Sequence, residues 1–205
     1  MSDRPHPLFA RAYEKLSPGA EKHGQAELRA RALAGLTGRV VEVGAGNGLN
    51  FRHYPAGVTE VIAVEPEPYL RERATERAAA AGVGITVVSG DAERVPLGDD
   101  EADAVVMSLV LCSVPDQAAA LAEAGRVLKP GGELRFYEHV VSERPARAAV
   151  QRALTRTVWK RISGGCHLDR DTGRAIADAG FTVEELDRLT FQGLSHVLGI
   201  ARRPA

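Results

Sequence analysis

The chain has 205 residues, 44% of them hydrophobic, and a formal net charge of -1. This length supports one substantial core, and the near-zero charge excludes a broad electrostatic attraction to nucleic acid. Two cysteines are too few for a disulfide framework and favour a reducing compartment. No apolar run approaches the ~20 residues that span a bilayer, and the segment from Met1 to Pro5 lacks a hydrophobic signal core, so we expect a cytoplasmic protein.

The predicted elements alternate between helices and strands. Hydrophobic periodicity predicts helices at 8–16 and 25–36, strands at 39–43 and 58–64, a helix at 68–81, strands at 85–88 and 104–111, a helix at 116–128 and a strand at 133–139. A basic helix at 145–162, a glycine loop at 164–165, a helix at 170–179 and strands at 181–189 and 194–201 follow. Asp116 is a predicted N-cap, and the segment from Lys129 to Gly132 predicts a sharp helix stop.

This alternation predicts an α/β fold with a doubly wound, mostly parallel sheet and right-handed crossovers. The last two strands are joined by residues 190–193, too few for a crossover, so they should pair antiparallel. We therefore expect a seven-stranded sheet with an antiparallel last strand, preceded by N-terminal helices. A single domain is expected over 1–205, with a helical cap at 1–37 and a lid insertion at 142–169.

Closely spaced glycines follow the first strand. Gly44, Gly46 and Gly48 allow positive φ and close approach of the backbone to a ligand, so they predict a turn beneath a nucleotide-like molecule. The dinucleotide fingerprint needs glycine at position 49, where this chain has Leu49, so NAD fits less well. The simpler alternative is an ordinary glycine-rich turn.

The acid-x-G-x-G-x-G spacing from Glu42 to Gly48 resembles the first motif of class I S-adenosylmethionine-dependent methyltransferases, which implies that cofactor. Narrower segments resemble the methyltransferase-like alkyl-thiol methyltransferase family from about Tyr13 almost to the C-terminus. These segments are 50–55, 109–114, 127–132, 138–140 and 165–168 followed by Arg170. The glycine loop and the Lys-Pro-Gly-Gly turn are also shared with quinone and phospholipid methyltransferases. The resemblance implies an N-terminal membrane anchor that we do not find here, so we expect at most weak peripheral membrane contact.

Several acidic residues follow predicted strands at the expected ligand edge. Glu65 ends the second strand, where a carboxylate can accept from both ribose hydroxyls. Asp91 either reads the adenine edge or caps a helix. Glu42 either faces the methionine ammonium or caps the loop amides. The expected donor-binding residues are Tyr13, Glu42, Gly44, Ala45, Gly46, Gly48, Asn50, Glu65, Pro66, Asp91, Ala92, Ser108 and Leu109, with the last two beside the sulfonium.

Methyl transfer needs alignment and exclusion of water, and a histidine would raise the thiolate fraction of a thiol acceptor. His139 exits the fifth strand beside Glu138, which could orient its ring, and His196 begins the antiparallel strand that returns to the same face. His167 is a third candidate. Each histidine has a structural alternative as a hydrogen-bonded group.

Cys112 and Cys166 are expected to pack as small apolar side chains. Cys112, Cys166, His167, Asp169 and His139 are residue types that could supply ligands to a metal ion. No pair has a recognised ligand spacing, so no metal is predicted.

The basic helix at 145–162 carries an apolar stripe of Val150, Leu154, Val158 and Ile162. Three roles remain open for it: a solvated helix packed on the sheet, a lid over an apolar acceptor, or a membrane-surface contact.

These observations favour an S-adenosylmethionine-dependent methyltransferase that acts on a small, largely apolar acceptor, and the resemblance favours a thiol or hydrosulfide. Phospholipid N-methylation and quinone C-methylation are the enzymatic alternatives. A non-catalytic module that senses S-adenosylmethionine and a nicotinamide oxidoreductase are the alternatives of another kind. The oligomeric state stays open.

Overall fold

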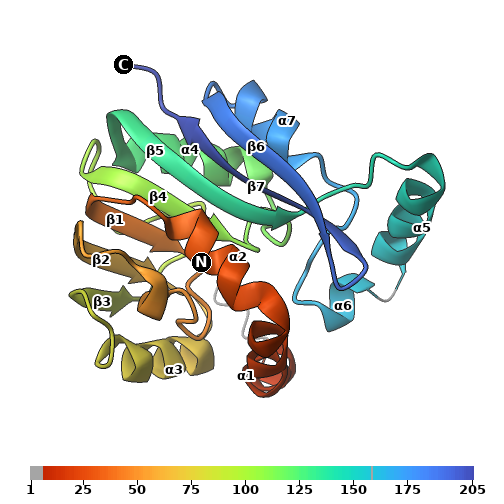
Figure 1. Cartoon of the computed structure of the whole chain (residues 1–205), viewed down its shortest axis with the longest axis horizontal. Coiled ribbons are helices and arrows are strands. Elements are labelled where there is room, and N and C mark those ends of the chain that lie inside the picture. Colours follow the sequence, from red (N-terminus) through yellow and green to blue (C-terminus); the bar gives the residue numbers. More distant parts are fainter. Residues whose placement is uncertain (1–6, 158) are drawn as a thin grey trace.

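The computed structural model describes residues 7–157 and 159–205. Its centre is a seven-stranded sheet with strand order β3-β2-β1-β4-β5-β7-β6 (Figure 1). The strands are β1 (Gly38–Val43), β2 (Val58–Val64), β3 (Ile85–Val88), β4 (Ala102–Ser108), β5 (Leu128–His139), β6 (Thr182–Phe191) and β7 (Leu194–Arg202). The first five strands run parallel, and β7 pairs antiparallel with both β5 and β6. The predicted doubly wound sheet with a reversed last strand is therefore confirmed.

Helices cover both faces of the sheet, and residues in alternate positions of the central strands supply the two cores. The helices are α1 (Pro7–Ala20), α2 (Ala26–Leu33), α3 (Pro68–Ala78), α4 (Gln117–Val127), α5 (Pro145–Arg156), α6 (Trp159–Ile162) and α7 (Thr172–Asp178). Val40 and Val106 pack in the core of α2 and α3, whereas Val41 and Val105 pack in the core of α4 and α7. Within the described ranges no helix is both long and apolar enough to cross a bilayer.

Of the two N-terminal helices, α1 is longer than the predicted 8–16 and α2 is shorter than the predicted 25–36, and the two are more closely joined than predicted. α1 continues through Pro18 to Ala20, and a short π-helical segment, Glu21–Gln25, leads directly into α2. Gly24 makes this junction possible because its φ of 109° is a conformation that side-chain-bearing residues rarely adopt. The bend sends α1 away from the sheet and toward the glycine loop.

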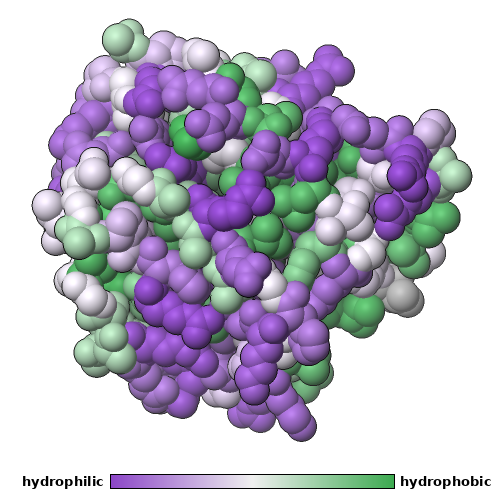
Figure 2. Space-filling model, viewed as in Figure 1, coloured by the Kyte–Doolittle hydropathy of each residue, from purple (hydrophilic) through white to green (hydrophobic). Residues whose placement is uncertain are grey.

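The predicted helix over 145–162 is wrong as one continuous element. α5 ends at Arg156, Thr157 has non-helical backbone angles (φ -109°, ψ -118°), and α6 begins at Trp159. Val158 of the predicted stripe lies outside the described residues. Val150, Leu154 and Ile162 are exposed, and Figure 2 shows hydrophobic side chains on the outer side of α5 and α6. These three side chains therefore do not pack on the sheet.

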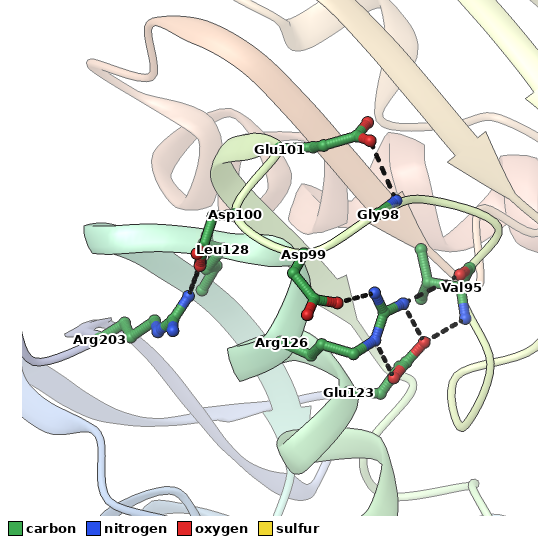
Figure 3. A network of polar contacts seen from close by, with 9 residues as sticks. All are labelled: Val95, Gly98, Asp99, Asp100, Glu101, Glu123, Arg126, Leu128 and Arg203. Atoms are coloured by element: carbon green, nitrogen blue, oxygen red, sulfur yellow. Dashed lines mark hydrogen bonds and ion pairs between the residues drawn. The ribbon is translucent and has the colours of Figure 1, made fainter.

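A polar network connects the segments around the start of β4, at the edge of the sheet opposite the expected ligand edge (Figure 3). Arg126 on α4 donates to Asp99 and Glu123 at 2.7 Å each, and Glu123 in turn accepts from the backbone N–H of Val95 at 2.8 Å. Arg203 donates to Asp100 and to the Leu128 carbonyl. These contacts tie the turn before β4 to α4 and to the C-terminal segment.

Candidate active site

The glycine loop begins directly after β1 and fits closely against the start of the loop after β4. Gly44, Gly46 and Gly48 have φ values of 65°, 56° and 80°. A Cβ added at Gly44 would lie 2.6 Å from a methyl carbon of Val110, so a side chain there would force a shift. The backbone N–H groups of Gly44 and Ala45 both donate to the Val64 carbonyl, at 2.8 and 3.1 Å. The loop is thus pinned to the end of β2.

Glu65 follows β2 and reaches into this loop. Its carboxylate accepts from the Gly46 N–H at 2.7 Å and from the Glu67 N–H at 2.9 Å. Burial raises the pKa of Glu65 to about 7, although both amides act in the opposite direction. A carboxylate oxygen has two lone pairs, so each oxygen can still accept from a hydroxyl group. Pro66 follows and is half-buried.

Glu42 lies in a buried polar network instead of capping the loop amides. Its carboxylate accepts from the Tyr54 hydroxyl at 2.7 Å and from the Asn50 side-chain amide at 2.9 Å. Asn50 also donates to the Ser108 hydroxyl at 3.2 Å and accepts from Arg29 at 3.0 Å. Burial raises the pKa of Glu42 to about 7. The roles of Tyr54 and Arg29 were missed in the sequence, although Tyr54 belongs to the segment 50–55.

Asp91 stands at a turn after β3. Its carboxylate accepts from the Glu93 N–H at 3.0 Å, and Asp91 forms an isolated bridge with Arg94. No helix begins at this turn, so the helix-cap interpretation is wrong. The adjacent Ala92 is buried.

α1 covers the glycine loop from outside the sheet. The ring of Tyr13 lies 3.5 Å from the position that a Cβ of Gly46 would take, and it stacks on Phe9 with a centroid distance of 5.8 Å. The Asn47 amide donates to Glu14 at 2.6 Å and to Ser17 at 3.1 Å. The N-terminal helix and the loop therefore form one packed unit.

β4 ends three residues earlier than predicted because the chain turns at Leu109, which has a φ of 62°. The Glu138 carboxylate accepts from three successive amides in this turn: Val110 and Leu111 at 2.9 Å each, and Cys112 at 3.0 Å. Adjacent strand residues point to opposite faces, so Glu138 points away from its neighbour His139. The expectation that Glu138 orients the His139 ring is wrong.

His139 and His196 converge, as their antiparallel pairing predicts. They are register partners in β5 and β7, and their ring centroids lie 4.4 Å apart. His196 also stacks on Tyr137, and its Nδ1 donates to the Leu194 carbonyl at 3.1 Å. Burial lowers the pKa of His196 to about 3, with help from the nearby His139, so His196 is a neutral imidazole.

Both cysteines contact His139. Its Nδ1 lies 3.6 Å from the Cys112 Sγ and 3.5 Å from the Cys166 Sγ. A hydrogen bond with the Cys166 thiol and, to a smaller extent, burial raise the pKa of Cys112 to about 12. The same hydrogen bond lowers the pKa of Cys166. The sequence pointed to each residue separately, but nothing in their chain spacing showed that they meet.

His167 does not join this cluster. It lies beside Asp169, with 3.8 Å between its Nδ1 and the nearest carboxylate oxygen, and burial lowers its pKa. Its backbone N–H donates to the Cys112 carbonyl at 2.7 Å. His167 therefore links the two cysteine-bearing segments through its backbone.

Two environments border the His139–His196 pair. Cys112, Cys166 and Leu168 form an apolar cluster against Leu109, Trp159 and Leu194. A polar cavity of about 220 Å³ opens on the other side, where the start of α5 meets β6 and β7. His196 lines this cavity together with the arginines Arg144, Arg147 and Arg188. None of the expected donor-binding residues lines it.

Comparisons with known proteins agree with this geometry. A methyltransferase domain model matches residues 41–136. The thiol S-methyltransferase TMT1B of Mus musculus is 36% identical over 186 residues, which cover 88% of this chain and 74% of that protein. The phosphatidylethanolamine N-methyltransferase of Cereibacter sphaeroides is 28% identical and covers 96% of this chain and 93% of its own length.

A solved structure of a SAM-dependent methyltransferase from Thermotoga maritima matches 96% of this chain and 97% of its own, with a TM-score of 0.71 and 25% identity. These relatives are methyltransferases, which agrees with the strand order, the reversed β7 and the glycine loop after β1. The chain belongs to the class I S-adenosylmethionine-dependent methyltransferase family and is similar within it to the thiol S-methyltransferases.

Proposed function

We propose that this enzyme transfers the methyl group of S-adenosylmethionine to the sulfur of a small, largely apolar thiol or of hydrosulfide. The observation that carries the acceptor class is the position of His139. Its ring lies at the end of β5, beside an apolar cluster that includes Leu109, Trp159 and Leu194. Such a site suits an apolar molecule whose one polar atom loses a proton.

We place the donor at the carboxyl ends of β1, β2 and β4. Glu65 would accept from the ribose hydroxyls, and the turn at Asp91 and Ala92 would border the adenine. The buried network of Glu42 and Asn50 would face the aminoacyl end. The complete proposed set is Tyr13, Glu42, Gly44, Ala45, Gly46, Gly48, Asn50, Glu65, Pro66, Asp91, Ala92, Ser108 and Leu109. The close fit of Gly46 against Tyr13 and the contact between Gly46 and Glu65 support this placement.

The chemistry is an in-line displacement. The acceptor sulfur forms a bond to the methyl carbon while the bond from that carbon to the sulfonium breaks, and the bonding electrons stay on the departing sulfur. The acceptor must also lose its thiol proton, because a thiolate is the stronger nucleophile. We assign the promotion of this loss to His139. His196, a neutral ring that packs against it at a tilt, supports its position. The backbone of His167 holds the loop that carries Cys166.

We assign the chain to one methyltransferase domain over 1–205, with a cap at 1–37 and a lid at 142–169. The cap is supported by the contacts of α1 with Asn47. The lid is supported by two links to the body: the His167 N–H donates to the Cys112 carbonyl at 2.7 Å, and Gln151 donates to the Val140 carbonyl at 3.1 Å. The two free cysteines suit a reducing compartment such as the cytoplasm.

A phospholipid head group is the second candidate acceptor. The exposed side chains Val150, Leu154 and Ile162 could rest on a lipid surface, and the similarity to a phosphatidylethanolamine N-methyltransferase points the same way. This acceptor would place the reacting nitrogen at a membrane surface.

The test is a methyl-transfer screen with isotopically labelled donor. Acceptors should include neutral and carboxylated thiols, hydrosulfide, phenols, quinones and phosphatidylethanolamine vesicles. We expect labelled thioether from thiols and a loss of at least about tenfold in rate for His139→Ala. Turnover on vesicles but not on thiols would favour the second candidate. Donor binding without transfer to any acceptor would favour a sensing module instead.

A further inference from the structure

The two cysteines and His139 are placed as ligands of a metal ion would be. The Nδ1 of His139 lies 3.6 and 3.5 Å from the sulfur atoms of Cys112 and Cys166, and all three atoms lie within 4.8 Å of one another. Tetrahedral zinc has bonds of about 2.3 Å to sulfur and about 2.05 Å to nitrogen, which separates the nitrogen from each sulfur by about 3.55 Å. Both observed distances agree with that value.

The backbone around both cysteines is fixed independently of their side chains. The Cys112 N–H donates to Glu138 at 3.0 Å, and the Cys112 carbonyl accepts from His167 at 2.7 Å. Cys166 follows Gly164 and Gly165, whose φ values of 64° and 93° let the chain turn back toward β4. These contacts hold the cysteines in place from outside, as the surroundings of a metal site must do.

The donor set favours zinc. Two thiolates and an imidazole form the Cys₂His set of catalytic zinc sites, in which the fourth position is left for water or substrate. Two thiolates would also balance the charge of a divalent cation. Among the described residues, no further histidine, cysteine or carboxylate joins these three residues as a fourth ligand. His139 is half-buried, which gives the ion a path from solvent.

We propose that Cys112, His139 and Cys166 bind one zinc ion and that the fourth position of this ion takes the acceptor thiol. The metal site stands on its own geometry, whereas the role of the fourth position rests on the proposed function. On coordination the thiol releases its proton to solvent, so His139 promotes this loss as a ligand of the ion and not as a base. The bound sulfur then forms the bond to the donor methyl as the sulfonium bond breaks, and the neutral thioether, a weak zinc ligand, departs.

The experiment uses the full chain, purified under reducing conditions without chelator, with its metal content measured by mass spectrometry. Metal-depleted protein is then titrated with Co²⁺, whose thiolate ligands give charge-transfer absorption. We expect about one zinc per chain and Co²⁺ binding that weakens by at least about 100-fold in Cys166→Ser and in His139→Gln. The control His23→Gln should bind Co²⁺ within about twofold of the unaltered chain, because His23 is exposed and lies outside the cluster.

Two further measurements separate the claims. Affinity for S-adenosylhomocysteine shows that each variant is folded, and addition of a small thiol to the Co²⁺ form should shift its visible absorption. Co²⁺ binding that is equal in all variants, copurified copper in place of zinc, or full thiol methylation by metal-free enzyme would overturn the zinc proposal. Tight zinc binding without methylation of any thiol would uphold the site and refute the proposed function.

Discussion

Replacement of Glu65 by glutamine tests the donor site at its most informative residue. The carboxylate accepts from Gly46 at 2.7 Å and from Glu67 at 2.9 Å while keeping lone pairs for the ribose. In Glu65→Gln, the amide NH₂ must face one of these N–H donors or a ribose hydroxyl, so at least one hydrogen bond to a charged group is lost. Such a bond contributes about 1.5–3 kcal/mol, which predicts S-adenosylmethionine binding that is about 10- to 150-fold weaker.

The pH dependence of binding provides a second readout. Burial raises the pKa of Glu65 to about 7, and ribose hydroxyls that donate to it favour the ionised form. Affinity should therefore rise with pH up to about 7 and level off above it, with a slope of up to about tenfold per pH unit below. Calorimetric titration from pH 5.5 to 8.5 measures both effects. Glu65→Gln should lose its share of this slope.

Glu67→Gln is the matched control, because Glu67 caps α3 by accepting from Leu70 at 2.7 Å and touches Glu65 only through its backbone N–H. Its donor affinity should change by less than about threefold. An unchanged affinity and an unchanged pH profile in a folded Glu65→Gln protein would refute our placement of the ribose.

Three further predictions concern stability. Gly44→Ala places a Cβ 2.6 Å from Val110 at a φ of +65°, so urea unfolding should show a free energy of unfolding lower by about 2–4 kcal/mol. Gly46→Ala has a similar φ of +56° but only a 3.5 Å contact, so its free energy of unfolding should fall by less. Equal losses in the two variants would contradict the role of the Val110 contact. Glu138→Ala leaves three buried amides without their acceptor and should cost at least about 3 kcal/mol, and a cost below about 1 kcal/mol would show that the turn does not depend on it. Burial raises the pKa of Glu42 to about 7, above its unfolded value, so this group favours folding at low pH and its contribution is lost as the pH rises. From pH 4.5 to pH 7.5 the free energy of unfolding of Glu42→Gln should therefore increase by about 3 kcal/mol relative to that of the unaltered chain. A difference between the two proteins that stays constant with pH would exclude the raised pKa.

The sequence was sufficient for the sheet because local signals and tertiary structure agree there. β4 is almost uniformly apolar, as a strand covered on both faces must be. The four residues predicted between the last two strands, of which Gln192 and Gly193 remain in the structure, allow no crossover. The glycines after Val43 mark where β1 turns. The reversed β7 follows from the same short connection, and it brings His196 to His139.

Two of the boundaries that failed have no stop signal in the local sequence. The segment from Leu109 to Cys112 is as apolar as the strand before it, so periodicity extends β4 too far. The strand ends at Ser108 because the Glu138 carboxylate binds the amides of the next turn from more than 25 residues away. The break at Thr157 in the basic helix likewise has no glycine or proline to announce it.

The cysteine cluster could not be read from spacing. Cys112 lies 27 residues before His139, and Cys166 lies 27 residues after it, which matches no metal-ligand motif. The three residues meet because the turn after β4, the end of β5 and the Gly164-Gly165 loop all lie at one edge of the sheet. Chain spacing alone therefore could not predict this cluster.

A crystal structure of the chain with S-adenosylhomocysteine is the most direct test of the proposed donor site. Our placement of the donor requires ribose hydroxyls on the Glu65 carboxylate, the nucleoside above Gly46 beneath Tyr13, and the homocysteine sulfur directed past Leu109 toward His139. A nucleoside bound elsewhere, or a sulfur that points away from the His139 cluster, would contradict it.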